Sequence, residues 1–424
     1  MASYIVDSLL HPSELVALVQ FLISGASSQK KIKSDRSTKT RCYEFLNMTS
    51  RSFAAVIQNL DDELRDVVCL FYLILRGLDT IEDDMTLSIE KKDPLLRDFY
   101  NIIRVEGWRF EESGDQEKDR QLLVEFYVVI DEFLKLDEKY QKVITDICKK
   151  VGNGMADYAT DAALNTYGII SLGDFDKYCH YVAGLVGIGL TNLFIASGLE
   201  AEIATRDEAI ANSMGLFLQK VNITRDYLED ISHGRCYWPK AIWSQYASNL
   251  YELKNPGNET EAINCLSAML LNTLQHVTQN LTYMNSLRNQ SIFEFCAIPQ
   301  VMAIATLALL FRNYDVYRKV VKIRKGQTLA LIKQSKNIYQ VAAVFRYYTQ
   351  QIMKKNDARD PNFLKISIVC GQIEQWCQTN LSQKDLQQYG YSQDPQITLF
   401  VIFLLLASTA WLVTTFNINV INMF

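Results

Sequence analysis

Two copies of the pattern Asp-x-x-Glu-Asp lie far apart in this chain, at 79–83 and 226–230, each within a stretch that has the apolar periodicity of a helix. Positions i, i+3 and i+4 share one helix face, so each copy places three carboxylates side by side. Because like charges at this spacing repel, two such clusters indicate that a cation brings them together. Carboxylates and substrate phosphates commonly hold Mg²⁺. We therefore predict a magnesium–diphosphate site with these ligands: Asp79, Glu82, Asp83, Asp226, Glu229 and Asp230.

The composition favours one large helical domain. The chain has 424 residues, of which 49% are hydrophobic, and only 18 are glycine and 7 proline. So few chain-breaking residues favour long helices over many short strands, and we predict an all-α fold. The formal net charge of -5 gives no support for a nucleic-acid partner, which would require a basic footprint.

Several common cofactor motifs are missing from the sequence. The nine cysteines show no paired spacing, which predicts reduced thiols in a protein facing the cytosol, and the four histidines are too dispersed for a zinc site. No phosphate-binding loop and no dinucleotide fingerprint is present. The glycines at 184, 187 and 189 have the wrong spacing for that fingerprint, and they indicate close helix packing or room for a ligand.

Two apolar stripes lead into the acidic motifs. One stripe precedes the first motif and the other precedes the second, both at spacings typical of a helix. Breaks are predicted at 152–154, 255–257 and 360–361, where glycine or proline interrupts the pattern. The two stripes are Leu64, Val67, Val68, Phe71, Leu75 and Leu78, and Ile210, Met214, Phe217 and Val221.

The C-terminal region predicts a membrane anchor. Residues 397–416 carry no charge and, at about 1.5 Å per residue, would span about 30 Å, the thickness of a bilayer core. A buried terminal helix is the alternative. We predict a catalytic domain over 1–379, a polar linker over 380–396 and a short tail over 417–424. The apolar stretch 292–311 contains polar residues and is interpreted as a core helix.

The acidic motifs imply the chemistry of a diphosphate leaving group. Metal ions and basic side chains neutralise its charge, and Arg76 and Arg225 stand beside the two motifs. An allylic leaving group would leave a carbocation, which needs a dry pocket with aromatic faces. The candidates, for each of which periodicity alone favours ordinary core packing, are Phe71, Tyr72, Tyr178, Tyr181 and Phe295.

Several separated segments together resemble the squalene synthase family. Two acidic motifs in this order, with the intervening segments and the predicted anchor, are far more specific than a single motif. The segments that carry the resemblance are 49–53, 76–84, 178–184, 219–230, 288–290, 295–300 and 322–327.

This resemblance implies an isoprenoid-synthase helical bundle around a central cavity. It also implies Mg²⁺-dependent head-to-head condensation of two farnesyl diphosphates to presqualene diphosphate, followed by NADPH-dependent reduction to squalene. The enzyme would be a monomer, anchored by its C-terminus in the endoplasmic reticulum membrane with its catalytic domain in the cytosol.

The resemblance also assigns roles to individual residues. Tyr178 would act as the acid/base of the first half-reaction, and Tyr72 and Phe295 would line the pocket near the cations. Taken alone, Tyr178 could be a core tyrosine, the 322–325 segment a solvated basic loop, and Arg51 a surface charge at a helix start. The basic residues that would bind diphosphate or the phosphates of NADPH are Arg51, Arg76, Arg225, Lys322 and Arg324.

Two rival functions remain open on the sequence. A phytoene-synthase-like enzyme would share the carboxylates without using NADPH, and a tail-anchored scaffold would carry only solvated acidic patches. Gly77, directly before the first motif, is predicted to allow close approach of the substrate.

Overall fold

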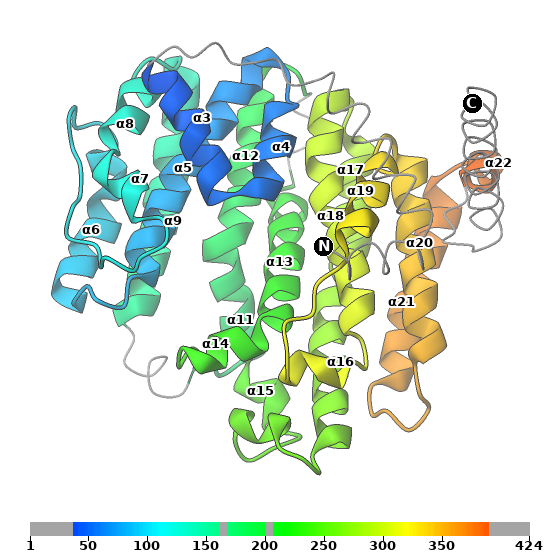
Figure 1. Ribbon diagram of the computed structural model, residues 1–424. Helices are drawn as coiled ribbons and strands as arrows, with labels where there is room; N and C mark the ends of the chain where they lie inside the picture. The colour runs from blue at the N-terminus through cyan, green and yellow to red at the C-terminus, as the bar shows by residue number, and fades with distance from the viewer. Residues whose placement is uncertain (1–36, 161–167, 201–206, 390–424) are drawn as a thin grey trace, which may run out of the picture.

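The computed structural model describes residues 37–160, 168–200 and 207–389. These ranges contain helices and connecting loops and no β-strand, which confirms the all-α class (Figure 1). The predicted anchor at 397–416 lies outside the described residues and stays a prediction. All nine cysteines lie within them and are unpaired.

The N-terminal helices form one side of the bundle (Figure 1). The predicted stripe from Leu64 to Leu78 is buried along α5, whose last turn carries the first acidic motif, and α6 packs along α9. These helices are α3 (Thr38–Thr49), α4 (Arg51–Gln58), α5 (Asp62–Asp83), α6 (Ile89–Ile102), α7 (Arg120–Val124), α8 (Tyr127–Phe133) and α9 (Glu138–Thr160).

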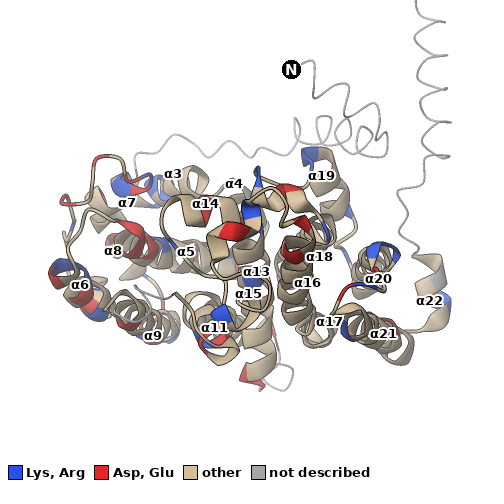
Figure 2. Ribbon diagram, turned by 90° about the horizontal axis from the view of Figure 1, so that it is seen from below, with Lys and Arg blue, Asp and Glu red and all other residues tan. Residues whose placement is uncertain are grey.

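The central helices carry the second motif and the tightest packing. A single turn of π-helix, η1, links α11 to α12, so that one helical run extends from Leu172 to Ser197. In Figure 2 the central helix α13 is mostly uncharged, whereas α6 at the periphery is heavily charged. These elements are α11 (Leu172–Cys179), η1 (His180–Gly184), α12 (Leu185–Ser197), α13 (Glu208–Arg225), α14 (Tyr227–Ser232) and α15 (Lys240–Trp243).

The C-terminal helices complete the bundle. Residues 383–388, which the composition placed in a linker, form α22, and the burial of Leu386 ties that helix to the folded unit. The remaining elements are η3 (Leu250–Lys254), α16 (Glu259–Leu274), α17 (Val277–Ser286), α18 (Gln290–Leu310), η4 (Tyr314–Tyr317), α19 (Lys325–Lys333), α20 (Ile338–Lys355), α21 (Phe363–Asn380) and α22 (Gln383–Gln388).

Two described helical segments are long and apolar enough to cross a membrane: the Leu172–Ser197 run and α18. In α18 the most apolar window is 72% buried inside the protein, which confirms the interpretation of 292–311 as a core helix. The Leu172–Ser197 run packs against α9 and α13 and belongs to the same bundle. Length and apolar composition therefore reflect core packing in α18.

Glycines allow α12 and α13 to approach closely. A Cβ at Gly187 would lie 2.4 Å from the carbonyl oxygen of Ala211, and one at Gly215 would lie 2.1 Å from that of Ala183. Neither backbone can move aside without separating the helices, so only glycine fits. The Gly184–Gly189 segment is thus a helix-packing surface, one of the two uses expected of it, and Gly187 also lines the apolar cavity described below.

The break predicted at 152–154 is wrong, because α9 continues through it to Thr160. A Cβ at Gly152 would lie 2.2 Å from the carbonyl oxygen of Leu96 in α6, and one at Gly154 would overlap the ring of Tyr181. These contacts offset the helix-weakening effect of glycine, about 1 kcal/mol relative to alanine. The breaks at 255–257 and 360–361 are confirmed.

The prediction for Gly77 is also wrong. Its missing side chain faces the buried rings of Phe126 and Phe99, where a Cβ would lie 2.7 Å and 3.1 Å from ring carbons. It therefore allows aromatic core packing and does not line the cavity described below.

Gly77→Ala should destabilise the protein by about 1–3 kcal/mol, because the added methyl group overpacks a rigid aromatic cluster. Gly371→Ala is the matched control: it also lies in a helix, α21, but a Cβ there has no neighbour within 4 Å. Removing this exposed helical glycine should stabilise the protein by about 0.5–1 kcal/mol. Urea unfolding of both variants checks the pair, and equal effects would contradict the packing argument.

A buried polar network joins α13 to neighbouring helices. Lys220 is 1% exposed; its ammonium lies 2.9 Å from His276 Nε2 and 2.6 Å from a carboxylate oxygen of Asp176. His276 Nδ1 lies 2.9 Å from the hydroxyl of Ser213. Burial, together with the charge of Lys220, lowers the pKa of His276 to about 3. The histidine is therefore held neutral.

His276→Gln should flatten the loss of stability in mild acid. The folded pKa lies below the unfolded value of about 6.5, so the unfolded chain binds the proton first. The stability that the neutral histidine contributes is complete above pH 6.5. Below that, the free energy of unfolding falls by about 1.4 kcal/mol per pH unit as the pH drops toward 3. Urea unfolding at pH 7.5 and 5.5 should show a drop about 1 kcal/mol larger in the wild type. Equal drops would show that the histidine titrates freely.

Candidate active site

The first acidic motif occupies the last turn of α5, between the core and a cavity. Asp79 keeps 37% of its side-chain surface accessible, but that surface opens into a cavity with mainly apolar walls, so its charged form is poorly hydrated. Burial therefore raises the pKa of Asp79 to about 6, against the lowering effect of Arg76. Burial, with repulsion from Asp83 and Asp79, raises the pKa of Glu82 to about 8.

The second motif spans the junction between α13 and α14. Asp226 is the residue between the two helices, and its carbonyl accepts a hydrogen bond from the Asp230 amide at 2.9 Å, so one helical turn is kept. Burial raises the pKa of Asp230 to about 6, against the lowering effect of Arg235. Arg225 binds the carboxylate of Asp226 with two hydrogen bonds, at 2.7 and 2.5 Å.

Arg235 joins the two motifs directly. Its Nη1 lies 3.1 Å from a carboxylate oxygen of Asp83, and its Nη2 lies 3.3 Å from one of Asp230. The two motifs, more than 140 residues apart in sequence, therefore face each other across one side chain. Sequence reasoning missed Arg235, although it lies five residues after Asp230, and the logic applied to Arg76 and Arg225 pointed to basic residues near each motif.

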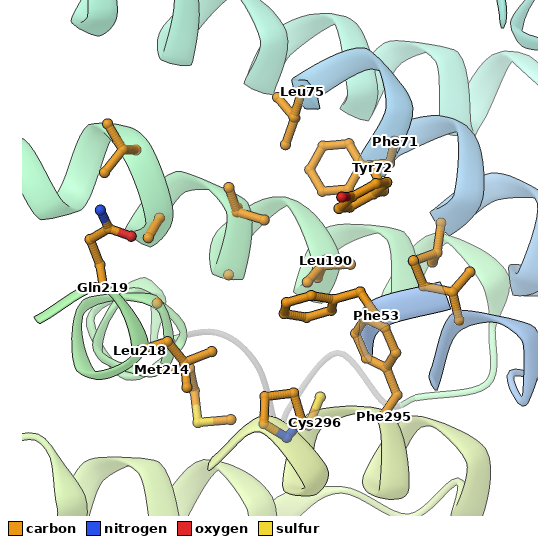
Figure 3. A pocket seen from close by; sticks show the side chains of 18 of the residues that line it. Phe53, Phe71, Tyr72, Leu75, Leu190, Met214, Leu218, Gln219, Phe295 and Cys296 are labelled. Atoms are coloured by element: carbon orange, nitrogen blue, oxygen red, sulfur yellow. The ribbon is translucent and has the colours of Figure 1, made fainter. Parts of the chain in front are cut away.

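An apolar cavity of about 290 Å³ lies beside the first motif (Figure 3). Phe71 and Tyr72 of α5 point into it, together with Phe53 of α4 and Phe295 of α18. Asp79 and Arg76 bring charge to the same space. Phe71, Tyr72 and Phe295, three of the aromatic candidates from the sequence, therefore line this cavity, and their roles stay predictions. Tyr178 and Tyr181 do not line this cavity.

Tyr178 lies instead at a second, polar cavity of about 730 Å³, which it shares with Glu82, Asp83 and Arg235. Its ring stacks on that of Tyr237, with the ring centroids 5.1 Å apart. Burial, followed by the nearby Tyr237 and Glu82, raises the pKa of Tyr178 well above its ordinary value. The hydroxyl therefore stays protonated.

The predicted basic residues separate into two groups. Arg76 donates a hydrogen bond to the Tyr72 hydroxyl at 3.2 Å and lies 3.5 Å from Asp79, so it belongs to the site, and Arg225 lies at the second motif. Arg51 is the first residue of α4. Lys322 and Arg324, in the loop before α19, line neither cavity.

The donor set fits a divalent cation. Its six side chains offer only carboxylate oxygens, and the raised pKa values of Asp79, Glu82 and Asp230 show that their negative charge lacks full compensation. In the described ranges, no three His, Cys, Asp or Glu side chains converge on one point. The carboxylates of Asp83, Asp226 and Asp230 contact arginines.

Known proteins resemble this chain along most of its length. Residues 46–327 match the squalene/phytoene synthase family. The squalene synthase of Schizosaccharomyces pombe is 50% identical over 418 residues, covering 90% of each chain. The squalene synthase of Mus musculus is 48% identical, covering 87% of each. A solved structure of TcSQS with the ligand E5700 aligns with a TM-score of 0.79 and 39% identity, covering 82% of this chain and all of its own.

Family match, relatives and fold agree with the geometry of two facing acidic motifs, the first of which borders an aromatic cavity. This chain therefore belongs to the squalene synthase family.

Proposed function

We propose that this protein condenses two farnesyl diphosphates to presqualene diphosphate with Mg²⁺ and then reduces that product to squalene with NADPH. The observation that carries the proposal is the meeting of the two acidic motifs at Arg235, together with Asp79 of the first motif in the wall of the apolar cavity. A scaffold protein with a solvated acidic surface patch would not need an aromatic cavity beside that patch.

The apolar cavity would hold the prenyl chains and exclude water. Bound to the six carboxylates, Mg²⁺ would supply positive charge that makes diphosphate a better leaving group. Arg76 lies within the cavity wall, where its guanidinium can bind diphosphate oxygens at the same end as Asp79. The aromatic faces of Phe53, Tyr72 and Phe295 would stabilise the allylic cation electrostatically.

Tyr178 would act as a hydrogen-bond donor and proton carrier. Its raised pKa keeps the proton on the hydroxyl, and the stacked ring of Tyr237 places a second phenol side chain beside it. Because Tyr178 faces the polar cavity together with Glu82, its predicted acid/base role belongs on the diphosphate side of the site.

The NADPH site is proposed at the start of α19. Arg324 is the N-cap of this nine-residue helix, and Lys322 is exposed beside it. A helix N-terminus flanked by basic side chains fits a phosphate group, and Arg51 is a further proposed contact. NADPH would supply the hydride of the second half-reaction. The proposed location is the cytosolic face of the endoplasmic reticulum membrane, with 397–416 as the anchor and the chain as a monomer.

Product analysis tests the reaction. The full-length chain is incubated with farnesyl diphosphate and MgCl₂, with and without NADPH, and the extracts are analysed by mass spectrometry. We expect squalene only with NADPH, and presqualene diphosphate without it. A C40 product from geranylgeranyl diphosphate would instead support the phytoene-synthase-like alternative, and the absence of any product would favour the scaffold.

Replacing one carboxylate of either motif should abolish turnover without unfolding the protein. Asp79→Ala and Asp226→Ala each remove a proposed metal ligand, and we expect a loss of at least about 100-fold in kcat. Asp157→Ala is the control, because that residue is 59% exposed on α9 and pairs with the surface residue Arg97. Circular dichroism should show the same helical content in all three, and retained activity in either motif variant would refute the metal assignment.

A further inference from the structure

Arg235 is held at the site by the helix end that carries the second motif. Its amide donates a hydrogen bond to the Asp230 carbonyl at 2.9 Å, and Gly234 before it has a φ of 74°. This left-handed turn directs the chain back after α14, so the guanidinium lies between the motifs.

The contacts of Arg235 are divided between two partners. It gives one Nη to Asp83 and the other to Asp230, at 3.1 and 3.3 Å, and its buried Nε has no acceptor within the described part of the chain. Arg346, equally exposed at 30%, instead binds the single carboxylate of Glu374 through Nε and Nη2 at 2.8 and 2.7 Å. A buried donor without an acceptor costs free energy, so the position of Arg235 is less favourable than a fork on one carboxylate.

The same two carboxylates belong to the proposed metal site. An oxygen that accepts a hydrogen bond from a guanidinium has less electron density to offer a cation. A guanidinium and a metal ion on the same carboxylate would also repel each other. The guanidinium also lies 5.9 Å from the ring centre of Tyr237, whose face can hold a displaced cation in the polar cavity.

We propose that Arg235 competes with Mg²⁺ for Asp83 and Asp230, so that metal binding has to displace its guanidinium. This inference rests on the proposed metal site and adds a residue that works against metal affinity. Arg235 thereby has a different role in each state. Without metal its guanidinium connects the two acidic motifs, and when metal binds, the displaced guanidinium carries its positive charge into the polar cavity.

The test compares Mg²⁺ affinity in two variants of the full-length chain by calorimetry with MgCl₂ alone. Arg235→Gln removes the competitor, and we expect Mg²⁺ to bind at least threefold more tightly. Arg235→Lys keeps the charge but loses the planar fork that reaches two carboxylates. Direct competition predicts tighter Mg²⁺ binding in this variant too. A Mg²⁺ affinity of Arg235→Lys equal to that of the wild type would mean that any positive charge near the site has the same effect, and it would overturn the proposal.

A second readout is thermal stability in EDTA and in saturating MgCl₂. Arg235→Gln should lower Tm in EDTA, because the two acidic motifs lose the side chain that connects them. In MgCl₂ the difference in Tm from the wild type should shrink at least by half. Arg346→Gln is the matched control and should show the same deficit in both. A deficit for Arg235→Gln that metal does not change would mean a purely structural role and would refute the inference.

The outcomes also separate this inference from the proposed function. If neither wild type nor variant takes up Mg²⁺, the metal site itself is refuted and the inference with it. If both bind Mg²⁺ with equal affinity, or the variant binds more weakly, only the role of Arg235 is refuted.

Discussion

The burial of negative charge at the ends of two apolar helices is the constraint on which the rest of this structure depends. A carboxylate removed from water is destabilised unless a cation compensates it. Here the raised pKa values of Asp79, Glu82 and Asp230 show that Arg76 and Arg235 compensate only in part. The same incomplete compensation would favour a divalent ion at the proposed metal site.

Close glycine packing supports this arrangement. The second motif follows α13, and α13 is held against α12 and η1 by contacts that exclude any Cβ at Gly187 and Gly215. Because these contacts are between backbones, α13 has little freedom to shift along its neighbours. These backbone contacts fix the position of α13, which leads into the second motif, so in the proposed metal binding Arg235 would move while α13 stays in place.

The sequence predicted those features that are local in the chain. Apolar spacing located α5 and α13, and the charge pattern located both motifs, because helix periodicity alone controls them. The position of Arg235 close after the second motif was a local signal that went unused, but its contact with Asp83, 152 residues away, depends on the tertiary fold. The predicted break at Gly152 was wrong for the same reason, since the contact with Leu96 that stabilises this glycine lies on another helix.

The separation into an apolar and a polar cavity explains why one fold can handle both ends of an amphiphilic substrate. Prenyl chains need a dry, aromatic space, whereas diphosphate needs cations and hydrogen-bond donors. Glu82 and Asp79 are three residues apart on one helix, yet Asp79 lines the apolar cavity and Glu82 the polar one. The last turn of α5 is thus the boundary, and a leaving group bound there would have its charge drawn toward Arg235 and Tyr178 while its carbon chain stays out of water.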